Sequence, residues 1–138
     1  MSSPLYPDLP FDSLPLELRE LLPQSKYDIA RMERCIEVGY PAIEPILPHL
    51  MLWVREANWP VYVVVTPFLA SLGEVILPEV HVVLASGDRI WMEWVLVDIV
   101  SQFPPSLVLN LADELRAFGE LGGSSSELAK RLVEAAEG

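Results

Sequence analysis

The sequence predicts an all-α protein made of stacked helical hairpins. Helical segments that end at glycine recur at a regular interval, and the glycines Gly39 and Gly73 each precede a segment that contains prolines. The segments Asn58–Trp59 and Asp88–Trp91 each place a helix-capping residue shortly before a tryptophan. A repeat of this length is typical of proteins in which pairs of helices stack on one another.

Residues 1–24 are expected to form an irregular N-terminal arm. This arm holds five of the 13 prolines, which are Pro4, Pro7, Pro10, Pro15 and Pro23. One short helix fits near Pro15–Leu22, and it would pack on the main body through a stripe of leucines. These are Leu14, Leu18, Leu21 and Leu22.

Residues 25–56 are expected to form the first hairpin. Ser25 and Asp28 fit a capping box at the start of its first helix, and Gly39 ends that helix. The apolar face of the helix should consist of Ile29, Met32 and Ile36. The second helix should run to about Arg55, with a bent or irregular first half because of its prolines.

Residues 58–87 are expected to form the second hairpin. Asn58 is a favourable N-cap, and Gly73 ends the helix that follows. Val61–Val65 has strand propensity, but Pro67 would break a central strand, so the segment is assigned to the helix. The partner helix should span Glu74–Ser86.

Residues 88–119 are expected to form the third hairpin. Asp88 caps a helix that runs to about Gln102, and Phe103–Pro105 forms a turn. One amphipathic helix follows, because apolar residues recur there at helical spacing. They are Leu107, Leu111, Leu115 and Phe118.

Residues 120–138 are expected to form a flexible Gly/Ser joint, Gly122–Ser126, and a C-terminal capping helix. Ser124 and Glu127 fit a capping box, and the apolar face of this helix should consist of Leu128, Leu132 and Ala136. The prediction is therefore an α-α superhelix of about three stacked HEAT-like hairpins over 25–119, with the arm before it and the capping helix after it.

The charge of the chain restricts its partners. Twenty acidic and nine basic residues give a formal charge of −11, which disfavours binding to nucleic acid and to anionic membranes. Met1–Pro15 has no basic segment followed by an apolar one, so no secretory signal is expected, and a cytoplasmic protein is the simplest interpretation. The charge-free run Ala57–Gly73 contains two prolines and is interpreted as a buried helix.

Four segments carry a resemblance to a known family. They are Gly39–Pro48, Asn58–Pro60, Phe68–Gly73, and Asp88 with Ile90, Trp91 and Trp94. Here the chain resembles a bacterial family of small HEAT-like proteins catalogued only as a domain of unknown function. The resemblance covers about residues 25–118. It implies an α-α superhelix and no particular activity, and both ends of the chain lie outside it.

Few residues suggest catalysis. His49 and His81 lie in the second helices of their hairpins, where each is either a partly buried imidazole or a metal ligand or general base. Cys35, the single cysteine, follows Arg34 and is either an inert packed residue or a nucleophile. No metal-ligand spacing, nucleophile elbow or phosphate loop is present, so no cofactor, metal site or catalytic set is predicted.

The four tryptophans, Trp53, Trp59, Trp91 and Trp94, are the strongest candidates for a binding role. Trp91 and Trp94 share a helix face, and Trp59 and Trp91 are interpreted as matching positions of consecutive repeats. They are either packed between repeats, as favoured for Trp91, or exposed as an aromatic surface that binds a partner. The acidic pair Glu33 and Glu37 is either solvated surface or part of a docking face for a basic partner.

The leading functional hypothesis is a non-enzymatic protein–protein interaction module. A narrower form is an immunity-type protein whose acidic surface covers a basic toxin. The alternative is a small enzyme that uses His81 or His49 with a nearby carboxylate. The position of the histidines discriminates between these classes, since a histidine that shares a concave pocket with a carboxylate favours the enzyme.

Overall fold

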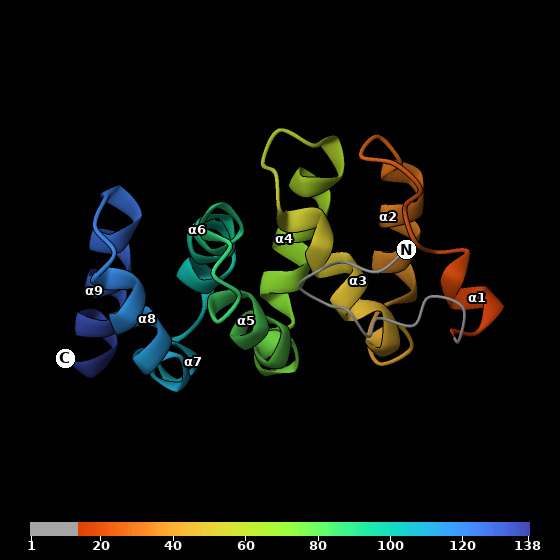
Figure 1. Ribbon diagram of the computed structural model, residues 1–138. Helices are drawn as coiled ribbons and strands as arrows, with labels where there is room; N and C mark the ends of the chain where they lie inside the picture. Colours follow the sequence, from red (N-terminus) through yellow and green to blue (C-terminus); the bar gives the residue numbers. More distant parts are fainter. Residues whose placement is uncertain (1–13) are drawn as a thin grey trace. The chain divides into compact units, whose positions relative to one another are not determined.

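The computed structural model describes residues 14–138, and every regular element in that range is a helix (Figure 1). The all-α prediction is therefore confirmed for this part of the chain, and Val61–Val65 is helical as predicted. The first part of the predicted arm, residues 1–13, lies outside the described residues. The chain divides into two compact units, Met1–Phe68 and Leu69–Gly138, which are described separately below.

The first unit, in its described part, contains short helices joined by turns. Its elements are α1 (Leu16–Arg19), α2 (Ile29–Val38), the 3₁₀ helix η1 (Glu44–Ile46), α3 (Leu47–Met51), η2 (Leu52–Val54) and most of α4 (Pro60–Ser71). As predicted, α1 lies beside leucines that become buried, namely Leu14, Leu21 and Leu22. The Cys35 thiol of α2 donates a hydrogen bond to the Leu21 carbonyl oxygen, at 3.0 Å, so α2 packs against this segment.

Helix α2 begins later than the capping-box pattern predicted. Its N-cap is Asp28, whose carboxylate accepts hydrogen bonds from the backbone N–H groups of Arg31, at 3.3 Å, and Gln24, at 3.1 Å. Ser25 instead accepts from the N–H of Tyr27 within a tight turn. The prediction was wrong because Asp28 was taken as the acidic partner of a serine cap, whereas it is itself the cap.

The second helix of the first hairpin is interrupted throughout its length. Residues 44–54 form η1, α3 and η2 in succession, and prolines stand in the first turns of η1 and α3. Proline lacks the N–H that an α-helix needs in its interior, which favours short pieces over one continuous helix. The predicted irregularity is present, and it extends beyond the first half.

The second unit consists of the end of α4 and the elements that follow it. They are η3 (Gly73–Ile76), α5 (Leu77–Leu84), α6 (Arg89–Asp98), η4 (Val100–Gln102), α7 (Pro105–Asn110), α8 (Ala112–Gly119) and α9 (Ser124–Glu137), joined by turns at Ala85–Asp88 and at Glu120–Gly123. The Asp88 carboxylate accepts a hydrogen bond from the Trp91 N–H, at 3.2 Å, which confirms the predicted cap of α6.

The single helix predicted after the Phe103–Pro105 turn is two helices, α7 and α8. Leu111, with φ −100° and ψ 9°, ends α7 and precedes α8. Its N–H bonds to the Val108 carbonyl, and its own carbonyl accepts from the Leu115 N–H, so the helix stops and restarts at this residue. Periodicity did not reveal this break because Leu111, Leu115 and Phe118 are buried on both sides of it.

Helix α9 starts and packs differently from the prediction. Its N-cap is Gly123, with φ 101°, and no side chain caps it, so the Ser124 capping box was wrong. Its fully buried residues are Ser126, Ala129 and Val133, whereas the predicted Leu128, Leu132 and Ala136 are half-buried. A Cβ atom at Gly119 of α8 would lie 3.0 Å from the Lys130 Cγ atom, so small residues allow α8 and α9 to approach closely.

An alignment of the chain with itself on its capping-type residues matches more positions than an alignment on the glycines does. This cap register aligns the capping-type residues Asp28, Asn58 and Asp88, and the positions one helical turn after them are all buried: Met32, Tyr62 and Met92. The segments Glu44–Pro48 and Glu74–Pro78 share the pattern Glu-x-Ile-Leu-Pro, and each forms a 3₁₀ helix that leads into an α-helix. In the cap register Trp91 corresponds to Val61, so the predicted match of Trp59 with Trp91 was wrong.

Helix α4 is strongly apolar and carries no charged residue. Val61, Val65 and Leu69 on it have no exposed surface. Within residues 14–138, no single helix combines the length and apolar character needed to cross a membrane, although α4 and the segment Gly73–Leu84 meet that criterion together as a sharply bent pair.

Candidate binding cavity and its polar network

The second unit contains an apolar cavity of about 460 Å³ between the end of α5, the start of α6, and α8. The side chains of Leu84, Met92 and Phe118 form its buried floor. Ala117 and Leu121 lie at its exposed rim, and Leu121 is 50% exposed. The cavity falls within the size range of ligand and side-chain pockets, about 300–1,000 Å³.

Two charged side chains, Arg89 and Glu114, complete the lining. Arg89 is placed by the turn before α6. Gly87, with φ 79°, allows this turn, and the Ser86 hydroxyl accepts a hydrogen bond from the Asp88 N–H, at 3.1 Å. Since Asp88 is the N-cap, Arg89 is the first residue of α6 and projects toward α8.

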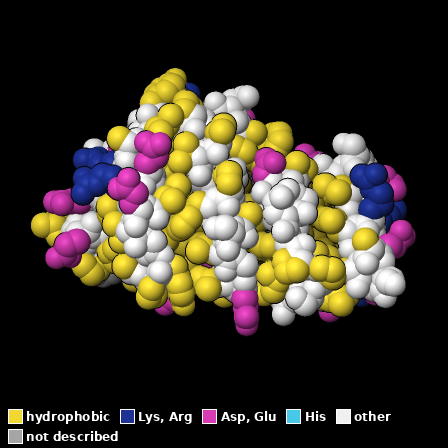
Figure 2. Space-filling model, turned by 180° about the vertical axis from the view of Figure 1, so that it is seen from behind, with side chains coloured by type: hydrophobic (Ala, Val, Ile, Leu, Met, Phe, Trp, Pro, Cys, Tyr) yellow, Lys and Arg dark blue, Asp and Glu magenta, His cyan; other side chains and the backbone are white. Residues whose placement is uncertain are grey.

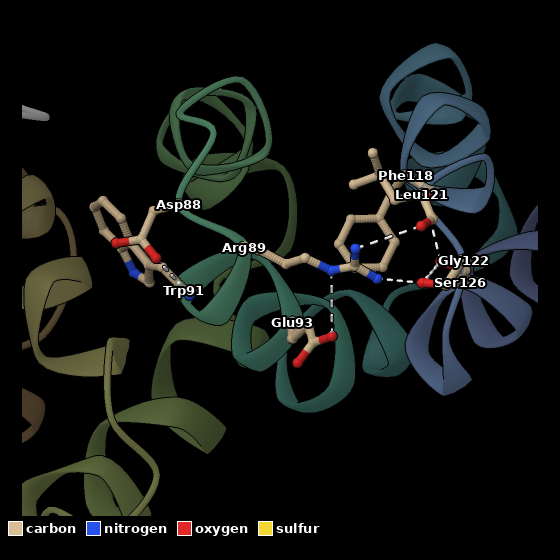
Figure 3. A network of polar contacts seen from close by, with 8 residues as sticks. All are labelled: Asp88, Arg89, Trp91, Glu93, Phe118, Leu121, Gly122 and Ser126. Carbon is tan, nitrogen blue, oxygen red and sulfur yellow. Dashed lines mark hydrogen bonds and ion pairs between the residues drawn. The ribbon is translucent and has the colours of Figure 1, made fainter.

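Arg89 connects α6 to the end of α8 (Figure 3). Its Nη1 atom donates to the Leu121 carbonyl oxygen at 3.4 Å, and its Nη2 atom donates to the Gly122 carbonyl oxygen. Its guanidinium carbon lies 5.8 Å from the centre of the Phe118 ring, and its Nε atom lies 3.7 Å from Glu93. A cation at the carbonyl end of a helix is favourable, so Arg89 stabilises the α8 terminus and forms one wall of the cavity.

The Gly/Ser joint carries hydrogen bonds at both of its ends. The buried Ser126 hydroxyl lies 3.0 Å from the Phe118 carbonyl oxygen and 2.8 Å from that of Gly122. These bonds and those of Arg89 connect the predicted joint to α6 and α8. Sequence reasoning did not identify Arg89 as a site residue, although its position directly after a capping aspartate marks it as the start of a helix.

His81 of α5 forms a second polar cluster beside the cavity. Its Nδ1 atom lies 2.9 Å from the Glu114 Oε2 atom of α8, and its Nε2 atom lies 2.9 Å from the Asn110 Oδ1 atom of α7. His81 therefore contacts a carboxylate that lines a concave pocket, which was the condition stated for the enzyme hypothesis. Both ring nitrogens contact side chains of this unit, and the His81 side chain is 39% exposed.

The remaining candidates for chemistry belong to the first unit. His49 of α3 is partly buried, and burial lowers the pKa of its imidazole below the ordinary value of 6.5. Cys35 is fully buried, and burial raises the pKa of its thiol to about 11, an effect larger than the opposing one of Arg34. Cys35 is thus a protonated core thiol at neutral pH. No group of three or more His, Cys, Asp or Glu side chains is placed to hold a metal ion within residues 14–138.

The tryptophans differ in exposure. Trp91 has no exposed surface, which agrees with its predicted core position and removes it from any binding surface. Trp94 is partly exposed in the second unit. In the first unit, Trp59 is partly exposed and meets Trp53 edge to face, with ring centres 5.6 Å apart, while the Arg55 guanidinium lies 5.9 Å from the centre of the Trp59 ring.

The two acidic candidates, Glu33 and Glu37, are both exposed on α2. They lie on the same helix as Val38, which is also exposed. Hydrophobic side chains likewise occupy much of the face shown in Figure 2, with carboxylates scattered between them.

A family model described as a domain of unknown function (DUF5071) matches residues 21–137. The match extends through the Gly/Ser joint and α9, so the expectation that the C-terminal part lies outside the family was wrong. A search among curated proteins finds no match.

Proposed function

We propose that this chain, which belongs to the DUF5071 family, is a non-enzymatic protein–protein interaction module. The apolar cavity of the second unit, open at a rim that contains the exposed Leu121, carries this proposal. Large apolar side chains are also exposed elsewhere, with Tyr27 at 68%, Val63 at 69% and Ile90 at 60%. Apolar side chains around a cavity favour a partner that buries them.

The hairpins are proposed to stack as a HEAT-like α-α superhelix. The cap register supports this arrangement, since the segments Glu44–Pro48 and Glu74–Pro78 adopt the same 3₁₀-to-α transition. Stacked helical repeats offer extended faces to partners. The inference from this architecture to binding is an analogy at the level of the fold.

The charge of −11 supports a basic partner, because opposite charges accelerate encounter. The second unit contributes eleven acidic and four basic residues, a formal charge of −7. An immunity-type protein that covers a basic toxin is a narrower form of the same proposal, and its support is this charge.

Capture of partners from the native cell, followed by quantitative mass spectrometry, tests the proposal. Two surface variants accompany the wild type: Tyr27→Ser with Val63→Ser in the first unit, and Ile90→Ser with Leu121→Ser in the second. Glu134→Gln, an exposed change on α9, is the control. We expect a reproducible partner that one surface variant loses and the control retains. Capture of no protein by the wild type would overturn the proposal, whereas equal capture by all variants would mean that the partner binds a different surface.

A small enzyme remains the second candidate because His81 and Glu114 are 2.9 Å apart beside a cavity. A histidine oriented by a carboxylate is a common general base. Hydrolysis of an activated ester by the wild type, lost in both His81→Gln and Glu114→Gln while each variant keeps its fold, would favour the enzyme. The interaction module predicts equal background hydrolysis by all three proteins.

A further inference from the structure

The helical repeats differ at one set of matched positions next to the cavity. In the first repeat, Leu50, Met51 and Val54 are apolar and have no exposed surface. In the cap register, Met51 aligns with His81 of the second repeat, and Leu50 and Val54 align with Asn110 and Glu114 of the third. In the second unit, His81 contacts both Glu114 and Asn110.

This polar cluster gives the cavity a carboxylate edge. The Glu114 side chain is 30% exposed and lines the cavity, whereas its counterpart Val54 is fully buried. Arg89, the cation of the lining, already contacts Glu93 and two backbone carbonyls. The lining is therefore apolar at its floor, and Glu114 is its acidic group, partnered by a histidine that carries charge only when protonated.

We infer that this cavity is the receptor for an apolar side chain on a basic amphipathic segment of the partner protein. The inference rests on the proposed interaction function and specifies its site. The apolar side chain enters between Leu84, Met92 and Phe118, while a neighbouring lysine or arginine approaches Glu114. Charge complementarity argues for this occupant, because the second unit has a formal charge of −7 (eleven acidic and four basic residues) and an acidic segment would be repelled.

Three synthetic helical peptides test the inference. The probe carries leucines on one face and lysines on the other. One control replaces the leucines with serine, and a second replaces the lysines with glutamate. Binding is measured by fluorescence anisotropy at physiological salt, where weak surface attraction between charges is screened. We expect only the probe to bind, and equal binding of the serine peptide would overturn the inference because charge alone would then suffice.

A cavity-filling variant locates the binding. Ala117→Trp places a large side chain at the rim, and Ala30→Trp makes the same change at an exposed position of α2. We expect Ala117→Trp to weaken probe binding by at least about tenfold and Ala30→Trp to leave it unchanged. Leu121→Ser, at an exposed position, supplies a second test if Ala117→Trp lowers the melting temperature, and it should weaken binding in the same direction.

The charge at the cavity edge is tested by Glu114→Gln. This variant should weaken binding of the lysine peptide by a few-fold, about two- to fivefold for one partly exposed charge pair. Unchanged probe binding in both Ala117→Trp and Leu121→Ser would overturn the inference. If those variants still capture the native partner, the protein is an interaction module that binds through a different surface. If the wild type captures no partner, the proposed function itself is wrong.

Discussion

Positions that the cap register aligns carry different side chains in the first and second units. Leu50, Met51 and Val54 of the first unit have no exposed surface. The corresponding residues His81, Asn110 and Glu114 of the second unit form a partly exposed polar cluster beside a cavity. Positions that are packed in the first unit can therefore have polar, partly exposed counterparts in the second unit, although two of them also align with Val80 and Leu84, which are apolar and buried.

Among the changes considered, a carboxylate introduced at a buried position of the first unit should reduce stability the most. Val54→Glu places a carboxylate at a position with no exposed surface, and Met51 stands where the cap register has His81. An unpaired buried charge is among the most destabilising changes, so we expect a loss of about 4 kcal/mol or more, or failure to fold. Urea denaturation followed by circular dichroism measures the loss. A stable Val54→Glu protein would show that the matched positions are equally tolerant.

Replacing the buried tryptophan of the second unit should also reduce the free energy of unfolding strongly. Trp91→Ala removes a fully buried side chain and should cost about 3–5 kcal/mol. Trp59→Ala removes a partly exposed ring that contacts Trp53 and Arg55, so its cost should be smaller, about 1–2 kcal/mol. Urea denaturation of the two variants and the wild type measures both losses. Equal losses, or an unchanged melting temperature for Trp91→Ala, would contradict the contrast in burial.

Local sequence signals predicted some helix ends correctly but not the continuity of the helices. Asp88 as the cap of α6 and the helix-ending glycines Gly39 and Gly73, both with positive φ, follow from the chemistry of single residues. The break at Leu111 does not, because the apolar spacing continues across it. The capping box at Ser25 failed since two nearby residues competed for one role and the stronger acceptor, Asp28, prevailed.

The sequence did not predict the cavity, and the physical reason differs from that for the helix break. Its lining combines residues from α5, α6 and α8, and which of them face one another depends on tertiary packing. The pairing of His81 with Glu114 likewise joins helices that are separated by several others along the chain. In the cap register, His81 and Glu114 align with the apolar residues Met51 and Val54 of the first unit. The correct repeat length would therefore have singled out both positions from the sequence.

Replacing the polar cluster with apolar residues should have a moderate effect on stability. The His81 and Glu114 side chains are 39% and 30% exposed, so their ion pair should contribute about 0.5–1 kcal/mol. A double-mutant cycle with His81→Leu and Glu114→Val measures that coupling. The double variant should be nearly as stable as the wild type, as apolar replacement of an ion pair often is. A coupling above about 3 kcal/mol would mean that the cluster is structural rather than part of a surface.

The smallest expected effect concerns pH and His49 of the first unit. Burial lowers the pKa of His49 below 6.5 in the folded protein, whereas the unfolded chain has the ordinary value. As the pH falls through 6.5, the unfolded state takes up a proton that the folded state takes up only at lower pH, so this residue reduces stability in acid. His49→Gln removes that proton uptake. The free energy of unfolding of the wild type minus that of the variant should therefore decrease between about pH 7.5 and about pH 5.5. Urea denaturation at several pH values measures the difference, and a difference that stays constant would show that His49 has the same proton affinity in both states.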